Sequence, residues 1–319
     1  MRWGILGAAN FARKTMGPAI HAARGAELAA LATTSSEKAE AFRAFAPCLK
    51  VHDSYDALLN DESIEAIYVP LPNHLHVEWT VKALNAGKHV LCEKPMALRE
   101  SDFDDLMTAR NTSGKLAAEA FMIVHHPQFE RARELVQGGT IGRLRFVDTV
   151  FSYYNSDTAN IRNRADAGGG GLYDIGVYTF GSVRFVTGAE PLRIREARID
   201  LENGVDVFAQ VSADFDDFSY AATVSMRMAS RQFITFQGEE GHLTLTAPFN
   251  ANLYDVAQLT LETKDGRRCS ERWPATNHYV LQVEAFEKSA SAGEDYACPL
   301  EFSRGTARMM DMVFDAGGT

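Results

Sequence analysis

Residues 3–12 read Trp-Gly-Ile-Leu-Gly-Ala-Ala-Asn-Phe-Ala, and this stretch decides how the N-terminal third of the chain folds. The apolar run 3–6 has the length of a buried strand, and it leads into small residues that are typical of a tight turn. The segment 10–24 that follows has the apolar spacing of a helix. The stretch therefore predicts a strand, a turn and a helix in direct succession.

Small residues occupy the three key positions of a G-x-G-x-x-G dinucleotide-binding loop, here Gly7, Ala9 and Ala12. In such a loop the first residue permits the turn, the second lets a pyrophosphate approach the backbone, and the third lets the helix pack on the strand. The N–H groups of the helix N-terminus then attract the phosphates. Because two of the three glycines are alanine, a plain strand–helix turn remains the alternative. The expected cofactor contacts are Gly7, Ala8, Ala9, Asn10, Phe11 and Ala12.

Strand-like and helical segments continue to alternate up to residue 121. Further strands are expected at 27–32, 66–69, 89–92 and 116–121, and helices at 37–45, 74–86 and 100–110. Such alternation predicts right-handed βαβ units and a parallel, doubly wound sheet. We therefore expect an α/β Rossmann domain that binds NAD(P) over residues 1–120.

The pattern changes after residue 121. Helices are expected at 126–136, 171–186, 279–292 and 303–316, and strands at 143–153, 193–201, 207–215, 220–228, 232–237 and 242–246. Runs of this length with turn residues between them are typical of an antiparallel sheet. Residues 121–319 are therefore predicted to form an α+β domain with an antiparallel sheet; the family resemblance described below implies that this sheet is large and open and that the domain serves substrate binding and oligomerisation.

Composition narrows the class of protein. The 319 residues are 46% hydrophobic and 23% charged, with a net charge of −10, which is ordinary globular composition. Bulk charge of this sign does not favour nucleic acid or an anionic membrane as partner, and no apolar run is long enough to cross a bilayer. The four cysteines form no CxxC pair, so we expect no metal site and no disulfide framework, in a cytoplasmic protein.

The end of the second expected strand bears on the choice of cofactor. An acidic residue there would bind the ribose 2′-hydroxyl of NAD, but this chain has Thr33, Thr34 and Ser35. Small hydroxyl side chains leave room for a 2′-phosphate, which Lys38 would neutralise. NADP(H) is therefore favoured and NAD(H) remains possible. In the alternative interpretation Ser36 caps a helix and Lys38 is solvated.

The stretch 87–97 contains a strand that ends in Glu93, Lys94 and Pro95. Ligands bind at the carboxyl ends of strands in sheets of this kind, and proline stops the strand there. Lys94 is thus a candidate for proton exchange with a substrate. In the alternative interpretation, Lys94 is a surface lysine that follows a strand and has no catalytic role.

Together with the stretches 68–76 (Tyr-Val-Pro-Leu-Pro-Asn-His-Leu-His) and 168–178, this Glu-Lys-Pro sequence resembles the Gfo/Idh/MocA oxidoreductase family over nearly the whole chain. The resemblance implies that Lys94 is catalytic and that the Lys94–Pro95 bond is cis. It also implies that the stretch 68–76 lines the nicotinamide side of the cleft. The cofactor contacts implied there are Leu71, Pro72, Asn73, His76, Glu93 and Lys94.

Asp174 and Tyr178 lie four residues apart, so on a helix they share one face. In the family this face meets the lysine and the substrate. A tyrosine at 178 is similar to the dihydrodiol dehydrogenase and NADP-dependent xylose dehydrogenase branch, whereas many members have histidine. Val124 stands where relatives often have arginine, which puts the usual substrate contacts of that segment in doubt.

Hydride transfer needs a group that exchanges the hydroxyl proton. Lys94 and Tyr178 are assigned this work, and which of them is the immediate acid or base stays open. Asp174 would bind a substrate hydroxyl, and Arg162 would add a substrate contact from the loop 155–167. In the alternative interpretation these residues have no direct role in catalysis. Asp174 would then be structural, Tyr178 would be part of the hydrophobic core, and Arg162 would be solvated.

These residues predict an NAD(P)-dependent dehydrogenase or reductase acting on CH–OH groups of a sugar, a polyol or a trans-dihydrodiol. Two other classes remain open: a redox-assisted glycosidase that retains NAD, and a non-catalytic NAD(P)-binding regulator. An open apolar sheet face implies a partner, so we expect a homodimer or homotetramer formed through the second domain.

Overall fold

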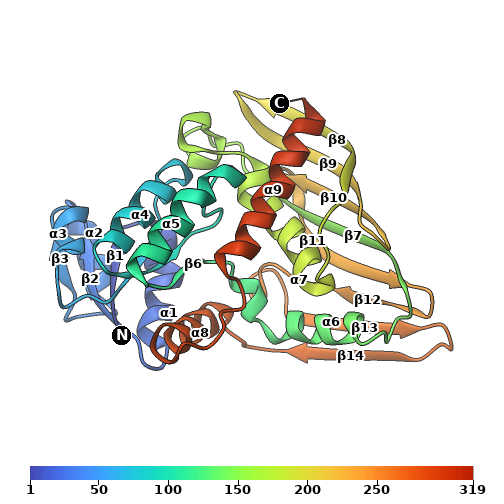
Figure 1. Ribbon diagram of the computed structural model, residues 1–319, viewed down its shortest axis with the longest axis horizontal. Helices are drawn as coiled ribbons and strands as arrows, with labels where there is room; N and C mark the ends of the chain where they lie inside the picture. Colours follow the sequence, from blue (N-terminus) through green and yellow to red (C-terminus); the bar gives the residue numbers. More distant parts are fainter. Residues whose placement is uncertain (319) are drawn as a thin grey trace. The chain divides into compact units, whose positions relative to one another are not determined.

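The computed structural model describes residues 1–318, which fall into two compact units (Figure 1). The first unit comprises Met1–Met122 and His278–Ser303, and the second comprises Ile123–Asn277 and 304–318. The division predicted from the sequence was contiguous. The compact units are not, because a helix near the C-terminus packs within the first unit.

The first unit is built on a six-stranded sheet in the order β3-β2-β1-β4-β5-β6. All neighbouring strands are parallel, so the predicted doubly wound Rossmann sheet is confirmed. The strand order reverses between β1 and β4, which is where such sheets bind ligands. The strands are β1 (Arg2–Leu6), β2 (Glu27–Ala32), β3 (Lys50–His52), β4 (Ala66–Val69), β5 (His89–Cys92) and β6 (Ala117–Glu119).

Helices cover both faces of this sheet. They are α1 (Gly17–Ala22), α2 (Ser36–Arg43), α3 (Tyr55–Leu59), α4 (His76–Asn85), α5 (Phe103–Ser113) and α8 (His278–Ala292), with short helical turns η1 (Ala12–Met16), η2 (Asn73–Leu75) and η3 (Glu100–Asp102). The predicted helix 10–24 thus includes a π-helical turn, η1, before α1.

Helix α8 joins the first unit through β1. The indole Nε1 of Trp3 donates a hydrogen bond of 2.6 Å to Glu287, and the Trp3 ring lies 5.0 Å from that of Phe286. All three side chains are buried. A contact between residues so far apart along the chain leaves no local pattern, which explains why the sequence placed this helix in the second domain.

The second unit is built on an eight-stranded sheet in the order β14-β13-β12-β11-β7-β10-β9-β8. Its strands are β7 (Leu144–Tyr154), β8 (Arg193–Glu202), β9 (Val205–Asp214), β10 (Ser219–Ser225), β11 (Arg227–Gly238), β12 (Gly241–Leu245), β13 (Ala257–Thr263) and β14 (Arg268–Trp273). Strands β7 and β10 pair in parallel and the other neighbours are antiparallel, so the sheet is mostly antiparallel. A helical crossover after β7 allows the parallel pair.

Helices α6 (Pro127–Gln137), α7 (Val177–Thr187) and α9 (Leu300–Gly317) lie over one side of this sheet in Figure 1. Helix α7 is buried on all sides from Val177 to Val186, and it follows directly on the π-helical turn η7 (Leu172–Gly176). The buried Arg184 in α7 bonds Thr306 in α9 at 2.6 Å and pairs with Glu190. The core of the second unit therefore lies between these helices and one face of the sheet.

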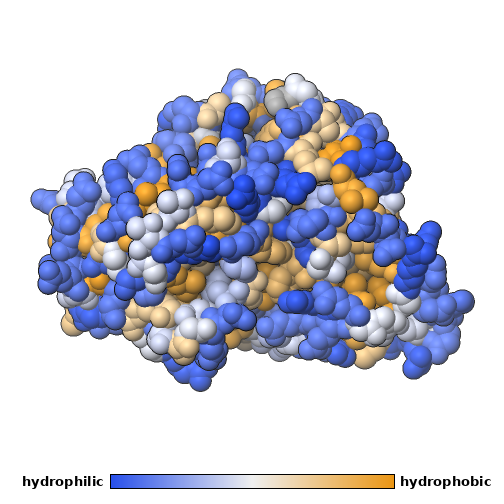
Figure 2. Space-filling view, viewed as in Figure 1, coloured by the Kyte–Doolittle hydropathy of each residue, from blue (hydrophilic) through white to orange (hydrophobic). Residues whose placement is uncertain are grey.

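Hydrophilic residues cover most of the face shown in Figure 2, between separate hydrophobic patches. Within residues 1–318, no helix is both long and apolar enough to cross a membrane. No disulfide joins the cysteines in this part of the chain.

Replacing Phe286 by alanine is expected to destabilise the first unit by about 3–5 kcal/mol, because the change leaves a cavity where α8 packs on β1. Urea unfolding followed by tryptophan fluorescence measures this loss. Lys288→Ala, an exposed change on the same helix, should alter the free energy of unfolding by less than about 0.5 kcal/mol. Equal effects of the two changes would show that α8 is not part of the core.

Candidate active site

The turn after β1 has the backbone conformation that a dinucleotide loop requires. Gly7 has a φ of 86°, and its N–H donates to the carbonyl of Ala32 at the end of β2 (3.0 Å). A Cβ at this position would lie 3.1 Å from the hydroxyl of Tyr55 and 3.3 Å from Leu71, so only glycine fits without strain. Alanines at the second and third motif positions keep the loop small, and Ala12 is fully buried.

The helical segment after this turn begins without a side-chain cap. Phe11 precedes η1 and makes no side-chain capping hydrogen bond, and Asn10 and Phe11 are exposed. Backbone N–H groups in the first turn of a helix have no intrahelical acceptors, and a phosphate satisfies them. The glycine turn and the uncapped start together fit a pyrophosphate.

Two of the hydroxyl side chains that follow β2 already accept hydrogen bonds from nearby backbone N–H groups. Ser35, rather than Ser36, is the N-cap of α2, where its Oγ accepts from the N–H of Lys38 (3.3 Å). The N–H of Ser35 in turn donates to Thr33 Oγ1 (3.2 Å). Thr34 and Lys38 are exposed. The arrangement offers hydroxyl groups, a helix N-terminus and one lysine to an anionic group.

The side chain of His76 lies between the turn after β4 and the turn after β5. One ring nitrogen lies 2.7 Å from the carbonyl oxygen of Leu71 and the other lies 2.7 Å from that of Pro95. The side chain is fully buried, and burial lowers its pKa to about 4. The neutral ring has one N–H and donates to one of these carbonyls, and its other nitrogen lies against the second carbonyl, so the side chain packs between the turn after β4 and the turn after β5. Pro72 and Asn73 lie half-buried in the first of these turns.

The Glu-Lys-Pro turn follows β5 directly. The Lys94–Pro95 bond is cis, as expected. The N–H of Glu93 donates to the carbonyl of Val69 (3.0 Å), and its carboxylate accepts from the hydroxyl of buried Tyr68 (2.5 Å). Burial and the neighbouring carboxylate of Glu93 both raise the pKa of Tyr68. Lys94 is half-buried at the carboxyl edge of the sheet.

In the second unit the structure brings Asp174 and Arg162 together. The carboxylate of Asp174, in η7, pairs with the Nε of Arg162 at 2.9 Å and accepts from the hydroxyl of Tyr153 at 2.6 Å. Asp174 raises the pKa of Arg162, which therefore carries its charge. The sequence did not single out Tyr153, whose one local clue is its position on β7 two residues after the inward-facing Phe151.

Tyr178 lies in an aromatic cluster. It is 7% exposed, and its ring lies 5.9 Å from that of Phe151 and 6.0 Å from that of Phe249. Tyr178 is the second residue of α7, which follows the π-helical turn that carries Asp174. The two candidate residues therefore lie on consecutive pieces of one helical segment.

Asp206, which sequence reasoning did not single out, holds the start of this helical segment. Its carboxylate accepts from the N–H of Leu172 at 2.6 Å, and burial raises its pKa to about 6. A Cβ on Gly170 would lie 2.1 Å from the Asp206 carboxylate, and one on Gly169 would lie 2.6 Å from the carbonyl of Arg162. The glycine run 168–171 is thus explained by close approach of backbone and carboxylate.

The candidate residues are divided between the two units. The first supplies the glycine turn, the hydroxyl groups after β2 and Lys94, and the second supplies Asp174, Arg162 and Tyr178. Within residues 1–318 no group of three or more His, Cys, Asp or Glu side chains is arranged to hold a metal ion.

Family models match both parts of the chain. The model described as an oxidoreductase family with an NAD-binding Rossmann fold matches residues 1–121. The model of the GFO/IDH/MocA C-terminal domain matches residues 129–244.

Individual relatives extend this match over the whole chain. The chain is 33% identical to D-xylose 1-dehydrogenase (NADP⁺) 2 of Haloferax volcanii, over 100% of the chain and 98% of that protein. It is 36% identical to a dTDP-3,4-didehydro-2,6-dideoxy-α-D-glucose 3-reductase of Streptomyces violaceoruber, over 92% and 88%. A solved 3-ketoreductase of Actinomadura kijaniata, in complex with NADP and TDP-benzene, superposes with a TM-score of 0.91 at 29% identity, over 99% and 97%. The chain therefore belongs to the Gfo/Idh/MocA family of oxidoreductases, and its first unit contains the NAD-binding Rossmann fold of that family.

Proposed function

We propose that this protein transfers a hydride between NADP(H) and the carbinol or carbonyl carbon of a sugar, polyol or trans-dihydrodiol. The observation that carries the proposal is the position of Lys94, which is half-buried directly after β5 at the carboxyl edge of the parallel sheet. The nicotinamide, when bound, supplies the hydride chemistry, and the chain must supply binding, orientation and proton exchange.

The preference for NADP(H) is supported by the end of β2. No acidic side chain follows Ala32 directly, where NAD-specific enzymes hold the ribose hydroxyl. The exposed Lys38 lies in the first turn of α2, whose N-terminus also favours negative charge. Relatives of both kinds described above, the xylose dehydrogenase and the 3-ketoreductase, use or bind NADP.

We assign proton exchange to Lys94 and Tyr178, and binding of a substrate hydroxyl to Asp174. A carboxylate held by Arg162 and Tyr153 has a fixed orientation, which suits an acceptor for a hydrogen bond from a substrate hydroxyl. Burial of Tyr178 among aromatic rings restricts its hydroxyl to few directions. The proposed contacts of the cofactor remain the residues of the loop after β1, the end of β2 and the turns after β4 and β5.

An uncharged substrate is favoured over a nucleotide-linked one by the charges of the loop 155–171. Its two arginines are both paired with carboxylates, Arg162 with Asp174 at 2.9 Å and Arg164 with Asp166 at 2.5 Å. A diphosphate needs positive charge that is not already neutralised. A neutral sugar or diol needs hydroxyl acceptors, and this loop and its helix present them.

The exposed face of the second unit's sheet is proposed as an association surface. Phe146, Phe208 and Phe233 lie on this face, half-buried, among polar residues of β9, β10 and β11. Apolar side chains on an open sheet face favour a partner, and a second copy of the chain is the simplest one. We also propose a cytoplasmic location, which suits cysteines that form no disulfide in residues 1–318.

Lys38→Glu is expected to weaken NADPH binding by about tenfold while changing NADH binding by less than about twofold, because it places a carboxylate near the 2′-phosphate. Fluorescence titration with the two reduced nucleotides measures the difference, which should shrink at high salt. Lys288→Glu, an exposed change of the same kind on α8, is the control for net charge. An equal loss with both nucleotides would rule out a phosphate-specific role.

Lys94→Ala is expected to lower kcat/KM by about 10² to 10⁴-fold and to leave the Kd for NADPH almost unchanged, since general acid–base catalysis contributes about this much. The assay is reduced-nicotinamide absorbance with aldoses, vicinal diols and dTDP-linked sugars. Tyr178→Phe in the same assay separates the two proton carriers. Turnover retained in Lys94→Ala contradicts the assignment, and a clear preference for the dTDP-linked sugars contradicts the uncharged substrate.

Light scattering coupled to size exclusion should give the mass of a dimer or tetramer at micromolar concentration. Phe233→Glu should shift the mass towards the monomer, because it places charge on the proposed association face. Leu253→Glu changes an exposed apolar residue outside the strands and should have no effect. A wild-type protein that is monomeric at these concentrations would contradict the association.

A further inference from the structure

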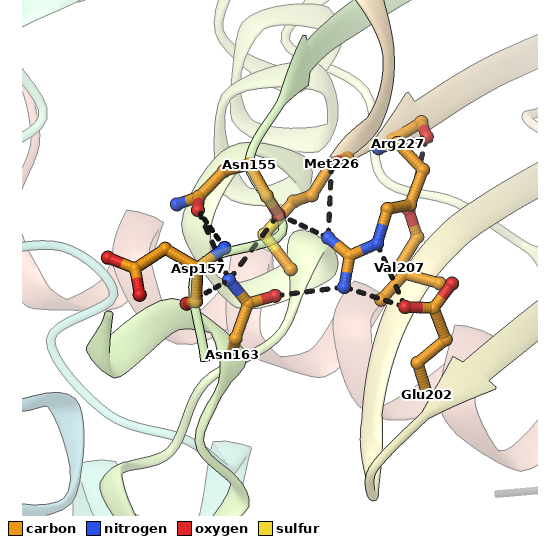
Figure 3. Close-up of polar contacts among 8 residues, drawn as sticks. Asn155, Asp157, Asn163, Glu202, Val207, Met226 and Arg227 are labelled. Carbon is orange, nitrogen blue, oxygen red and sulfur yellow. Dashed lines mark hydrogen bonds and ion pairs between the residues drawn. The ribbon is translucent and has the colours of Figure 1, made fainter. Parts of the chain in front are cut away.

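The loop that carries Arg162 is fastened at its base by Arg227, the first residue of β11 (Figure 3). The guanidinium donates from Nη2 to Asn163 Oδ1 (3.1 Å) and from Nε to Glu202 Oε2 (2.9 Å). Its Nη1 donates to the carbonyl oxygens of Asn155 and Met226. Asn155 and Asn163 belong to the loop, so the planar donor fork of one arginine contacts two separate points of it.

Asn163 completes the fastening from the side of the loop. Its side-chain nitrogen donates to the carbonyl of Asp157 (2.9 Å) and to Asn155 Oδ1 (3.3 Å), while its oxygen accepts from Arg227. The residue is 7% exposed, so water does not readily replace these partners. Figure 3 shows the two side chains facing each other between the loop and the sheet.

Arg162 immediately precedes Asn163, and its guanidinium holds Asp174 at 2.9 Å. Its carbonyl accepts the N–H of Gly170 (2.9 Å), so the backbone at 162–163 is held from both sides. Met226, directly before Arg227, also lies in the buried cluster on which Tyr153 packs, and Tyr153 is the other partner of Asp174. A shift of Arg227 would therefore disturb both groups that orient this carboxylate.

We propose that Arg227 is a positioning residue for the substrate, acting through Asn163 to hold the Arg162 guanidinium against Asp174. The inference rests on the proposed function, in which Asp174 binds a substrate hydroxyl. Glu202 pairs with the same guanidinium at 2.8 Å and orients it from the side away from the loop. Lysine in place of Arg227 has a single nitrogen, which cannot donate to Asn155, Asn163 and Glu202 in the same geometry.

Steady-state kinetics of Arg227→Gln test the proposal. The KM for the sugar or diol should rise by about tenfold or more, with the Kd for NADPH changed by less than about twofold, because the loop contacts substrate and not cofactor. Arg227→Lys should fall between wild type and Arg227→Gln. Asn163→Ala should raise KM similarly, and the double variant should be little worse than either single one, as residues acting through one contact are not additive.

Arg198→Gln is the matched control. Arg198 is an arginine of the same sheet that pairs with Asp200 on its own strand, β8, and its removal should leave KM unchanged. A rise in KM with this control equal to that of Arg227→Gln would overturn the proposal, because loss of any arginine of the sheet would then suffice.

Limited trypsin digestion of the native protein gives a readout that needs no activity. Cleavage after Arg162 and Arg164 should be about tenfold faster in Arg227→Gln than in wild type or Arg198→Gln, because local opening of the loop exposes these bonds. A folded Arg227→Gln protein with unchanged KM and unchanged cleavage overturns the proposal. If wild type turns over none of the sugars or diols, the proposed function fails, and the cleavage rates still decide whether Arg227 fixes the loop.

Discussion

Parallel pairing of β1 with β4 and of β4 with β5 brings the carboxyl ends of these strands to one edge of the first sheet, and the candidate cofactor residues follow from this arrangement. Gly7 leaves β1, Leu71 lies after β4 and Lys94 follows β5. The buried ring of His76 contacts the backbone of the turn after β4 and of the turn after β5, and so helps to fix the distance between them. The glycine turn and the lysine therefore lie at the same edge of the same sheet.

In the second unit the candidate residues lie on a helical turn and a loop rather than at the ends of parallel strands. Asp174 lies on a π-helical turn whose start is held by Asp206, a carboxylate from β9. Arg162 pairs with Asp174 from a loop without strands, and Arg227 of β11 bonds that loop at Asn155 and Asn163. Each polar contact is supplied by an element distant along the chain, and the mostly antiparallel sheet is the rigid part that brings them together.

Local patterns were sufficient for five of the six strands of the first sheet, all but β3, and for the most specific motif. The runs at 3–6, 66–69 and 89–92 are continuous apolar segments, which is how buried parallel strands read. The strand β3 was missed because Lys50 and His52 dilute its apolar character, and β14 was missed because half of its residues are charged. The strand β13 was also missed, although apolar and polar residues alternate along it as in a half-buried strand. Pairing of β10 with β7, and attachment of α8 to β1, depend on contacts that no window of sequence contains.

The same reason explains which site residues escaped the sequence. Tyr153, Asp206 and Arg227 bond partners 21, 34 and 64 residues away, and each is an ordinary strand residue in its local context. Lys94 and Asp174 were found because they belong to compact motifs.

Because Arg227, which fastens the loop 155–167, and its partner Glu202 both lie on strands outside that loop, the loop is not a self-contained module. Exchanging it between family members, to transfer substrate choice, would carry Asn163 without its arginine unless position 227 were exchanged as well. Gly170 imposes a further condition, since its close approach to Asp206 excludes any side chain there. A functional chimera therefore has to inherit the strand positions 202, 206 and 227 with the loop, as one block.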